Sequence, residues 1–445
     1  MNELYVISTS VILVFLILRQ LQVWRWRCLI SPGFYFGVLW ILGVIGVYLF
    51  AELEIFPVSF PEYLDELNIY VGFTGLCFIY FTPKGRNMVL NEGINFTFLP
   101  NFRLYFCLSS FLLIVALSTF ISSGADFNMG AARERMHETL ENQSVIVGYA
   151  QSLSAVLSIC AGYVFGNLFN GKVRLSLFRK AVYLFPIVSG LLFSIYLGGR
   201  VNLVYAIVEY IIGFSLAIPI MPKKKINRKI FIYVFSSLFI VSSFISLVAA
   251  QRQKHQGGAS YQYNLVSEIS PIMFLAYGPM EYMVASYLGY QYRRDDMVDL
   301  TNLGYGSYTF NGFINWTIPF AARFGLEDVS IAKTFDIYHD AQASYDYKRM
   351  YYYTTHSCYT PIVQDFGKIG ALFLIIFLTY ISHMLFVSIQ KCRTVKYATR
   401  LFLFYLFLFY WVKSNYYGYF MNSVLVVLYG FLIIDILKIV KTRPR

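Results

Sequence analysis

The segment LYFCLSSFLLIVALSTFISS, residues 104–123, contains no charged side chain. A helix needs about 20 consecutive apolar residues to cross the hydrocarbon core of a bilayer. Further predominantly apolar runs, some with one or two charged residues, occur at residues 2–18, 33–51, 66–82, 144–167, 181–197, 201–218, 230–250, 366–389, 400–413 and 417–437. We therefore predict an all-α polytopic integral membrane protein with about 11 transmembrane helices.

The composition favours the same class of protein. Of the 445 residues 58% are hydrophobic and only 13% are charged, with a mean hydropathy of +0.56. Soluble domains carry about 25% charged residues. The net charge is +12, and in a membrane protein such an excess normally lies in cytoplasmic loops. The basic charge therefore does not indicate nucleic-acid binding, and we expect no nucleic-acid partner.

Basic residues are concentrated in every second connection between the predicted spans, and acidic or mixed connections alternate with them. By the positive-inside rule the N-terminus is then outside and the C-terminus cytoplasmic. The first apolar run has no basic segment before it and no small-residue cleavage site, so we interpret it as a span. The basic residues are Arg19, Arg25, Arg27, Lys84, Arg86, Lys172, Arg174, Arg179, Lys180, Lys223, Lys224, Lys225, Arg228, Lys229, Lys391, Arg393, Lys396, Arg400, Lys438, Lys441, Arg443 and Arg445.

This topology divides the chain into three parts. Residues 1–250 form transmembrane helices 1–8, and residues 251–362 form a large external (periplasmic) loop rich in Tyr, Gly and Asp. Residues 363–445 form transmembrane helices 9–11 and a basic cytoplasmic tail. Within the loop, SPIMFLAYGPMEYMVASYLGY (residues 270–290) is apolar but interrupted by proline and glycine. Such a pattern favours short re-entrant or interfacial helices over a full span.

Several common kinds of site find no support in the chain. The six cysteines are scattered, and no CxxC pattern or His/Cys cluster occurs. Neither a metal site nor a disulfide framework is therefore indicated. The chain also lacks a Walker loop, HExxH and GxSxG. We expect no metal and no other cofactor.

Arg200 is the strongest candidate for a binding residue. It follows Gly198 and Gly199 between two apolar runs, and an arginine near the centre of a transmembrane helix costs about 2.5–3.5 kcal/mol on insertion scales. Its guanidinium fork suits phosphate oxygens, whereas a snorkelling arginine is the alternative. The predicted topology places it at the outer face, where an anionic lipid-linked substrate would bind. Glu209 is too far along the same helix to pair with it.

Two more basic positions fall at the predicted outer face. Arg252 begins the external loop, next to Lys254 and His255, and would bind anions or simply flank the interface. Arg135 lies in GAARERMHE, where the alternating charges equally describe a short solvated helix.

The end of the external loop carries the candidate bases. His356 is the usual type of general base near neutral pH, and Asp365 is the second candidate. Asp365 also precedes a predicted span, where an acidic N-cap or first-turn residue is stabilising. His383 lies farther along that span and is expected at its cytoplasmic end.

The chain resembles a known family in layout and in a few motifs. Gly-Gly-Arg opens a span, a long outer loop comes late, and Asp-Phe-Gly-x-x-Gly ends that loop. This pattern is similar to the Wzy-type O-antigen and capsule oligosaccharide repeat-unit polymerases. Thr354 stands where the family often has Asn. The residues that carry the resemblance are Gly198, Gly199 and Arg200; Tyr277 to Leu288; and Ser357, Pro361, Asp365, Phe366, Gly367 and Gly370, with Ser31 to Gly33 in addition.

The resemblance implies glycosyl transfer at the periplasmic face of the bacterial inner membrane. A growing glycan would move from undecaprenyl diphosphate onto another lipid-linked repeat unit. Arg200, Arg252 and Arg135 would bind the diphosphate, and His356 or Asp365 would be the base. Tyr277 and Tyr359 would contact sugar rings. The partners would be the lipid-linked oligosaccharide, membrane lipids and a chain-length regulator membrane protein.

Three other functions fit parts of the pattern. An O-antigen ligase uses the same donor with a different acceptor and has the same layout. A lipid-linked oligosaccharide flippase or transporter would need charged residues deep in many helices, whereas Glu209 is nearly alone there. A membrane acyltransferase would need a His-centred motif in or near a span, which His356 matches only in part.

Overall fold

The computed structural model describes residues 3–52, 63–83, 98–99, 101–122, 145–169, 171, 173–196, 357–391 and 440–441, with single positions between 206 and 217 and at 284, 287 and 290. Helices dominate this part of the chain. Two short strands, β1 (Phe98–Leu99) and β2 (Val440–Lys441), pair antiparallel. The helices are α1 (Glu3–Trp24), the 3-10 helix η1 (Arg25–Ile30), α2 (Pro32–Glu52), α3 (Tyr63–Phe81), α4 (Phe102–Ser122), α6 (Val145–Phe169), α7 (Leu177–Tyr196) and α14 (Tyr359–Lys391).

The described helices support a multi-pass membrane protein. Five segments are long and apolar enough to cross a membrane: Glu3–Trp24, Pro32–Leu49, Phe102–Ser122, Leu177–Ile195 and Asp365–Ser388. Large apolar side chains on their outer surfaces, such as Ile114 and Phe373, are exposed, as expected where lipid covers them. The predicted spans at 230–250, 400–413 and 417–437 lie outside the described residues, so the total of about 11 stays a prediction.

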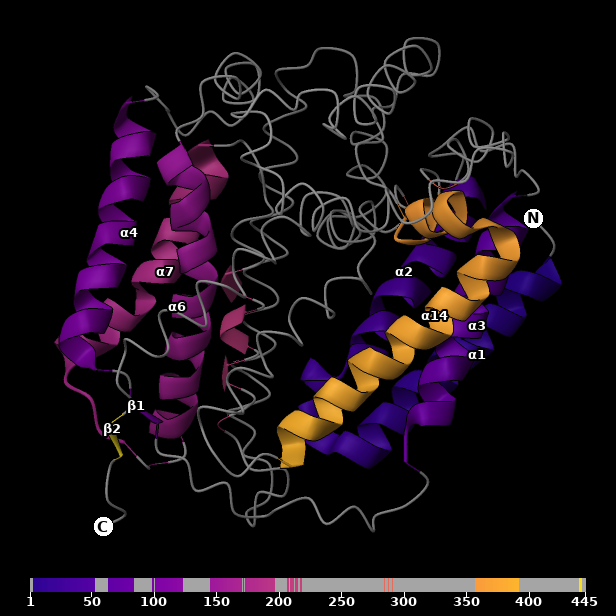
Figure 1. Ribbon diagram of the computed structural model, residues 1–445, viewed down its shortest axis with the longest axis horizontal. Coiled ribbons are helices and arrows are strands. Elements are labelled where there is room, and N and C mark those ends of the chain that lie inside the picture. The colour runs from indigo at the N-terminus through magenta and orange to yellow at the C-terminus, as the bar shows by residue number, and fades with distance from the viewer. Residues whose placement is uncertain are drawn as a thin grey trace, which may run out of the picture.

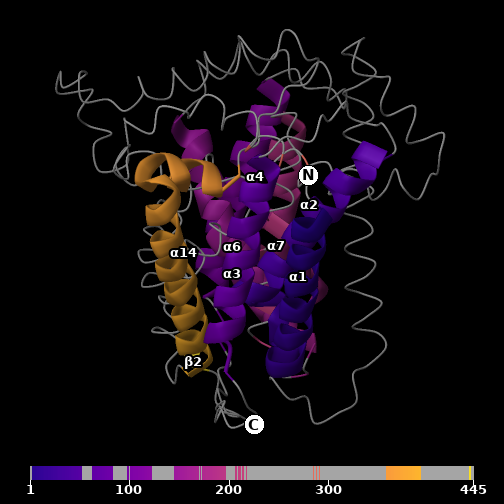
Figure 2. The same cartoon turned by 90° about the vertical axis from the view of Figure 1, so that its right-hand side faces the viewer.

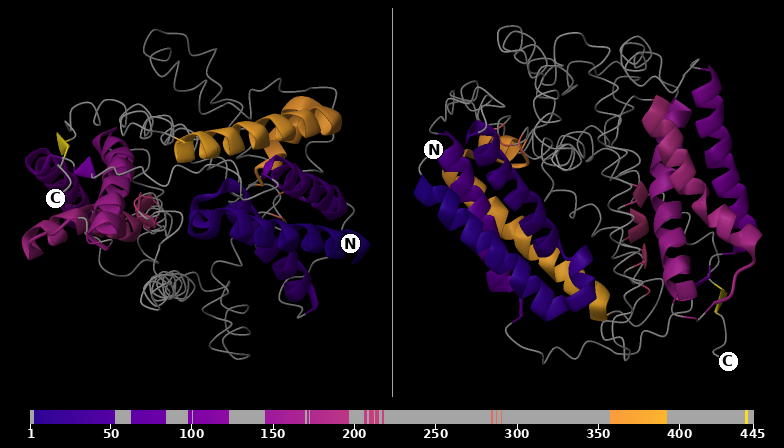
Figure 3. Two further views of the ribbon diagram at one scale, coloured as in Figure 1. Left: turned by 90° about the horizontal axis from the view of Figure 1, so that it is seen from below. Right: turned by 180° about the vertical axis from the view of Figure 1, so that it is seen from behind.

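The helices stand in two groups, which Figures 1 and 3 show side by side. The α14 group contains α1, α2, α3 and α14, and the α6 group contains α4, α6 and α7. Each group buries its own apolar core. Leu13, Phe36 and Leu67 are fully buried in the first core, and Leu112 and Val164 in the second.

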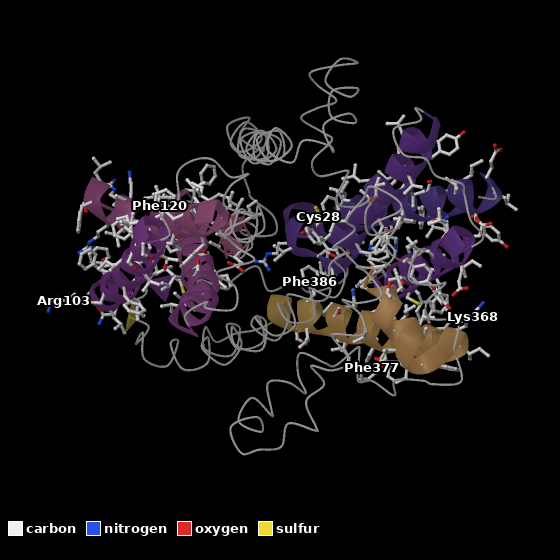
Figure 4. The ribbon with its side chains drawn as sticks, turned by 90° about the horizontal axis from the view of Figure 1, so that it is seen from above. Cys28, Arg103, Phe120, Lys368, Phe377 and Phe386 are labelled. Carbon is white, nitrogen blue, oxygen red and sulfur yellow. The ribbon has the colours of Figure 1, made fainter. Side chains whose placement is uncertain are left out.

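The two groups meet at one end of the molecule. Trp24, at the end of α1, belongs to the core of the α6 group together with Phe386 of α14. The two rings meet edge to face with their centroids 4.8 Å apart. His383 of α14 lies 6.2 Å from the Trp24 ring, near the end of α14 opposite to Tyr359, and the cytoplasmic face predicted for this end stays a prediction. Figure 4 shows Cys28 and Phe386 between the groups.

The two ends of the bundle differ in charge. We name the end with η1, β1 and β2 the inner end and the opposite end, where α3 and α14 begin, the outer end (Figure 1). The described inner end carries most of the basic residues, and the outer end carries Asp65 and Glu66. This separation agrees with the predicted alternation of charge, whereas the membrane face of each end stays a prediction.

A buried polar network closes the inner end of the α14 group. The Gln20 side chain donates to Thr82 Oγ1 and accepts from Ser31 Oγ, each at 2.6 Å. A Cβ on Gly33 would lie 2.8 Å from Gln20 Nε2. The Ser31 to Gly33 motif therefore joins the turn between α1 and α2 to the end of α3. Beside it, burial lowers the pKa of Arg27 to about 10, with a smaller opposing effect of Tyr163.

Glycines let α6 approach the segment between 206 and 217 closely. A Cβ on Gly162 would meet the backbone of Tyr210, and one on Gly213 would meet the backbone of Ile159. Gly162 and Gly166 are spaced as in the small-xxx-small motif of membrane helices. Glu209, on the same segment, is 5% exposed.

The start of α14 differs from the sequence prediction. This helix begins at Tyr359, inside the predicted external loop of residues 251–362. Its first turns contain polar residues at the membrane end, which an apolar-run criterion does not include.

Candidate functional site

The N-terminus of α14 is capped by Ser357. The Tyr359 backbone N–H donates to Ser357 Oγ at 3.1 Å, and the Thr360 N–H donates to the Ser357 carbonyl at 3.2 Å. Pro361 follows in the first turn, where a backbone N–H has no partner within the helix. Ser357 therefore caps the short segment of α14 before the kink at Gly367. The role predicted for Asp365 at the start of the span stays a prediction.

The Asp-Phe-Gly-x-x-Gly motif forms a kink in α14. Gly367 has φ 66° and ψ 179°, a combination that is essentially limited to glycine. A Cβ on Gly370 would lie 2.8 Å from Phe366 Cβ. Glycine at this position therefore avoids a clash with the Phe366 side chain. Figure 2 shows the short segment before the kink lying across the outer end. Both glycines are thus required by the geometry of one turn.

A charged cluster lies just beyond the kink. The Lys368 ammonium is 3.0 Å from Glu66 Oε2 of α3, and the Tyr290 hydroxyl donates to Glu66 Oε1 at 2.8 Å. The Tyr70 hydroxyl points to the Lys368 carbonyl at 3.4 Å. The Lys368 side chain is 55% exposed and that of Glu66 15% exposed. Figure 4 shows Lys368 at the rim of the α14 group.

Aromatic rings pack beneath this cluster. The Tyr359 ring stacks on Tyr70 at 5.9 Å and contacts Trp40 of α2 at 5.3 Å. The Tyr359 hydroxyl shares a 2.8 Å hydrogen bond with Thr74 Oγ1. The Tyr287 ring also contacts Trp40, with the ring centroids 5.2 Å apart. The helices α2, α3 and α14 are therefore joined by one buried aromatic cluster.

The stretch around Tyr287 and the stretch around Ser357 lie together in this cluster. Val284, Tyr287 and Tyr290 are buried in the same core as Cys358 and Tyr359. The positions 284, 287 and 290 recur every third residue, as on one face of a helix. The stretch around Tyr287 and the motif that ends the external loop are far apart in sequence and adjacent in space.

Burial keeps Cys358 and Tyr359, at the start of α14, in their neutral forms. Burial raises the pKa of the Cys358 thiol well above its usual range, so the sulfur is not the thiolate needed for nucleophilic catalysis. Burial also raises the pKa of Tyr359 well above its usual range, and the nearby Cys358 raises this pKa by a smaller amount. Neither side chain is a base at neutral pH.

The structure brings together Asp365 and Tyr359 among the predicted site residues. Both have no exposed surface and lie on the short helical segment before Gly367. The roles predicted for them stay predictions. Arg200, Arg252, Arg135, Tyr277 and His356 lie outside the described residues.

Sequence reasoning missed Glu66, Tyr290 and Lys368 as parts of the site. Glu66 belongs to an acidic stretch at the start of α3, and its sequence neighbours give no sign of a partner on α14. Lys368 had a detectable signal, because a lysine within the predicted outer end of a span runs against the positive-inside pattern. Among the described residues no group of three or more His, Cys, Asp and Glu is placed to bind a metal.

Comparisons of the chain with protein-family models, curated proteins and solved structures find no match.

Proposed function

We propose that the protein polymerises undecaprenyl-diphosphate-linked oligosaccharide repeat units into O-antigen or capsular polysaccharide. The reaction takes place at the external face of the bacterial inner membrane. The enzyme is a glycosyltransferase that needs no metal in this proposal, because arginine side chains at the outer face stabilise the diphosphate leaving group.

One observation carries the proposal. The motif stretches around Tyr287 and Gly367 converge at the outer end of the α14 group, and Gly367 holds a conformation that requires glycine. Two of the stretches that carry the resemblance therefore lie at a single place, and Gly367 has a structural reason for its identity there. That place is polar and aromatic, as a glycan site at the outer face requires.

The chemistry follows from the proposed substrates. A hydroxyl oxygen of the acceptor repeat unit forms a bond to the anomeric carbon of the growing glycan. The bond between that carbon and the diphosphate oxygen breaks, and undecaprenyl diphosphate leaves with the electron pair. The hydroxyl proton goes to a base. Arg200 and Arg252 bind the diphosphate, and the growing chain ends on the acceptor lipid.

His356 remains the first candidate for the base and Asp365 the second. His356 directly precedes the Ser357 cap, so it belongs to the segment that enters α14. Asp365 is fully buried in α14, two residues before Gly367, where it is suited to orient neighbouring groups. A pH profile of the transfer rate for a His356→Gln variant separates the two assignments.

The proposal is tested with a glycan ladder in a strain that lacks this chain. The deletion strain is expected to lose long-chain glycan and to keep single repeat units on the outer side of the membrane. Wild-type chain restores the ladder, Arg200→Ala does not, and Arg103→Ala, an exposed inner-end control, does.

Three outcomes would contradict the proposal. A normal ladder with Arg200→Ala excludes the assigned diphosphate residue. A deletion strain that keeps its polymer but loses surface attachment is a ligase mutant. Repeat units that accumulate on the cytoplasmic side identify a flippase.

A further inference from the structure

Lys368 is the only lysine or arginine that the described ranges place at the outer end. The remaining basic residues in those ranges lie at the inner end: Arg19, Arg25, Arg27, Arg103, Arg174, Arg179, Lys180, Lys391 and Lys441. A cation at the outer end opposes the charge asymmetry that orients a membrane protein. Its presence there calls for a local reason.

The surroundings hold Lys368 in one position. Gly367 turns the chain immediately before it, and the Tyr70 hydroxyl points to its carbonyl at 3.4 Å. Glu66 Oε2 lies 3.0 Å from the ammonium. The other oxygen of Glu66 accepts from Tyr290 at 2.8 Å, which orients the carboxylate. The Lys368 backbone is therefore fixed by the Gly367 turn and Tyr70, and its ammonium is fixed by Glu66.

The ion pair does not account for the lysine by itself. The Lys368 side chain is 55% exposed, and exposed ion pairs contribute little to stability. An ammonium has three N–H donors, and Glu66 is its single partner among the described residues. The side that faces away from Glu66 is open to a ligand. The ligand chemistry that suits such a fixed point charge is a phosphate oxygen.

We propose that Lys368 is a substrate-binding residue that contacts the diphosphate of the lipid-linked donor, with Glu66 and Tyr290 as its positioning residues. The inference rests on the proposed function and adds a cation to the arginines assigned from the sequence. Lys368 is the first variable position of the Asp-Phe-Gly-x-x-Gly motif, directly after the kink at Gly367, so a diphosphate held there lies at the motif that ends the external loop.

The first test measures binding of farnesyl diphosphate to the full-length protein in nanodiscs. Lys368→Met is expected to weaken binding about tenfold, as for the loss of one charge-assisted contact, and Lys368→Arg to retain it. Lys180→Met, which removes an inner-end lysine, leaves affinity unchanged. Farnesol, which lacks the diphosphate, binds weakly to every variant.

The outcomes separate this inference from the proposed function. Wild-type protein that binds farnesyl diphosphate while Lys368→Met binds it equally well overturns the assignment of Lys368 alone. Wild-type protein that does not bind farnesyl diphosphate overturns both. Equal affinity for inorganic diphosphate, with the same dependence on Lys368, identifies a free-anion site and overturns the lipid-linked source.

A charge exchange distinguishes substrate binding from a purely structural ion pair. The double variant Glu66→Lys with Lys368→Glu keeps the attraction between α3 and α14. Because position 66 is only 15% exposed, a cation there is poorly placed to reach a ligand. We expect a melting temperature close to that of wild type without recovery of farnesyl diphosphate binding. Recovery of both would overturn the proposal.

Discussion

Gly367 is the residue on which the shape of α14 depends. Its φ of 66° with ψ of 179° is strained for any residue with a Cβ. We expect Gly367→Ala to lower the free energy of unfolding by about 1–3 kcal/mol and to weaken the Glu66–Lys368 contact that follows the kink. Thermal melting of the purified protein measures the first effect, and farnesyl diphosphate binding measures the second.

Gly72→Ala is the matched control for this change. A Cβ at Gly72, in the interior of α3, would lie 3.5 Å from Thr9 Oγ1, an ordinary contact distance. Alanine in a helix interior is favoured over glycine by about 0.5–1 kcal/mol, so this variant should melt at or above the wild-type temperature. Equal melting of Gly367→Ala and Gly72→Ala would refute the kink geometry.

Single residues also show where sequence reasoning reaches its limit. The Asp-Phe-Gly-x-x-Gly pattern indicated a special site, but only the backbone shows that its first glycine forms a kink. Tyr359 was predicted to contact sugar, and the structure gives it full burial and a hydroxyl bonded to Thr74. Burial depends on which helices pack over a residue, and its own sequence neighbours do not contain that information.

At the scale of the element, α6 depends on the absence of side chains at two positions. A Cβ at Gly162 would meet the Tyr210 backbone, and one at Gly166 would lie 2.6 Å from the Ala217 Cβ. Gly162→Ala should therefore push the two segments apart, and overpacking of this kind costs about 1–3 kcal/mol. The melting temperature of the purified variant measures the loss.

The same substitution has opposite expected signs on two helices. Gly162→Ala should destabilise, because backbone lies where the methyl group would go, whereas Gly72→Ala should not, because α3 leaves room for it. If Gly162→Ala melts like wild type, the close approach of α6 to the segment between 206 and 217 is wrong.

The predicted span boundaries match some helices and miss part of α14. The predicted spans at 33–51 and 104–123 correspond to α2, Pro32–Glu52, and α4, Phe102–Ser122. The predicted span at 366–389 misses the first turns of α14, which begins at Tyr359. Those turns are buried against α2 and α3, so their helical structure depends on tertiary contacts as well as on the Ser357 cap.

For the whole molecule, the predicted topology is open to a direct test. Ser122 is exposed at the outer end of α4, and Arg174 is exposed near the inner end of α7. In a variant without other cysteines, Ser122→Cys should react with a membrane-impermeant maleimide added to spheroplasts. Arg174→Cys should react only after the membrane is opened, because the basic end is expected in the cytoplasm. Labelling in the reverse order would invert the assignment of the two ends and remove the proposed site from the external face.

The sequence by itself determined the membrane class, the places of the described helices and the separation of charge between the two ends. These properties follow from length, apolarity and the sign of nearby side chains, which are local quantities. Only the tertiary structure decided that the helices form two groups and that Glu66, Tyr290 and Lys368 meet beside the Gly367 kink. The physical reason is that these contacts join residues far apart in the chain, and they depend on which helix faces pack together.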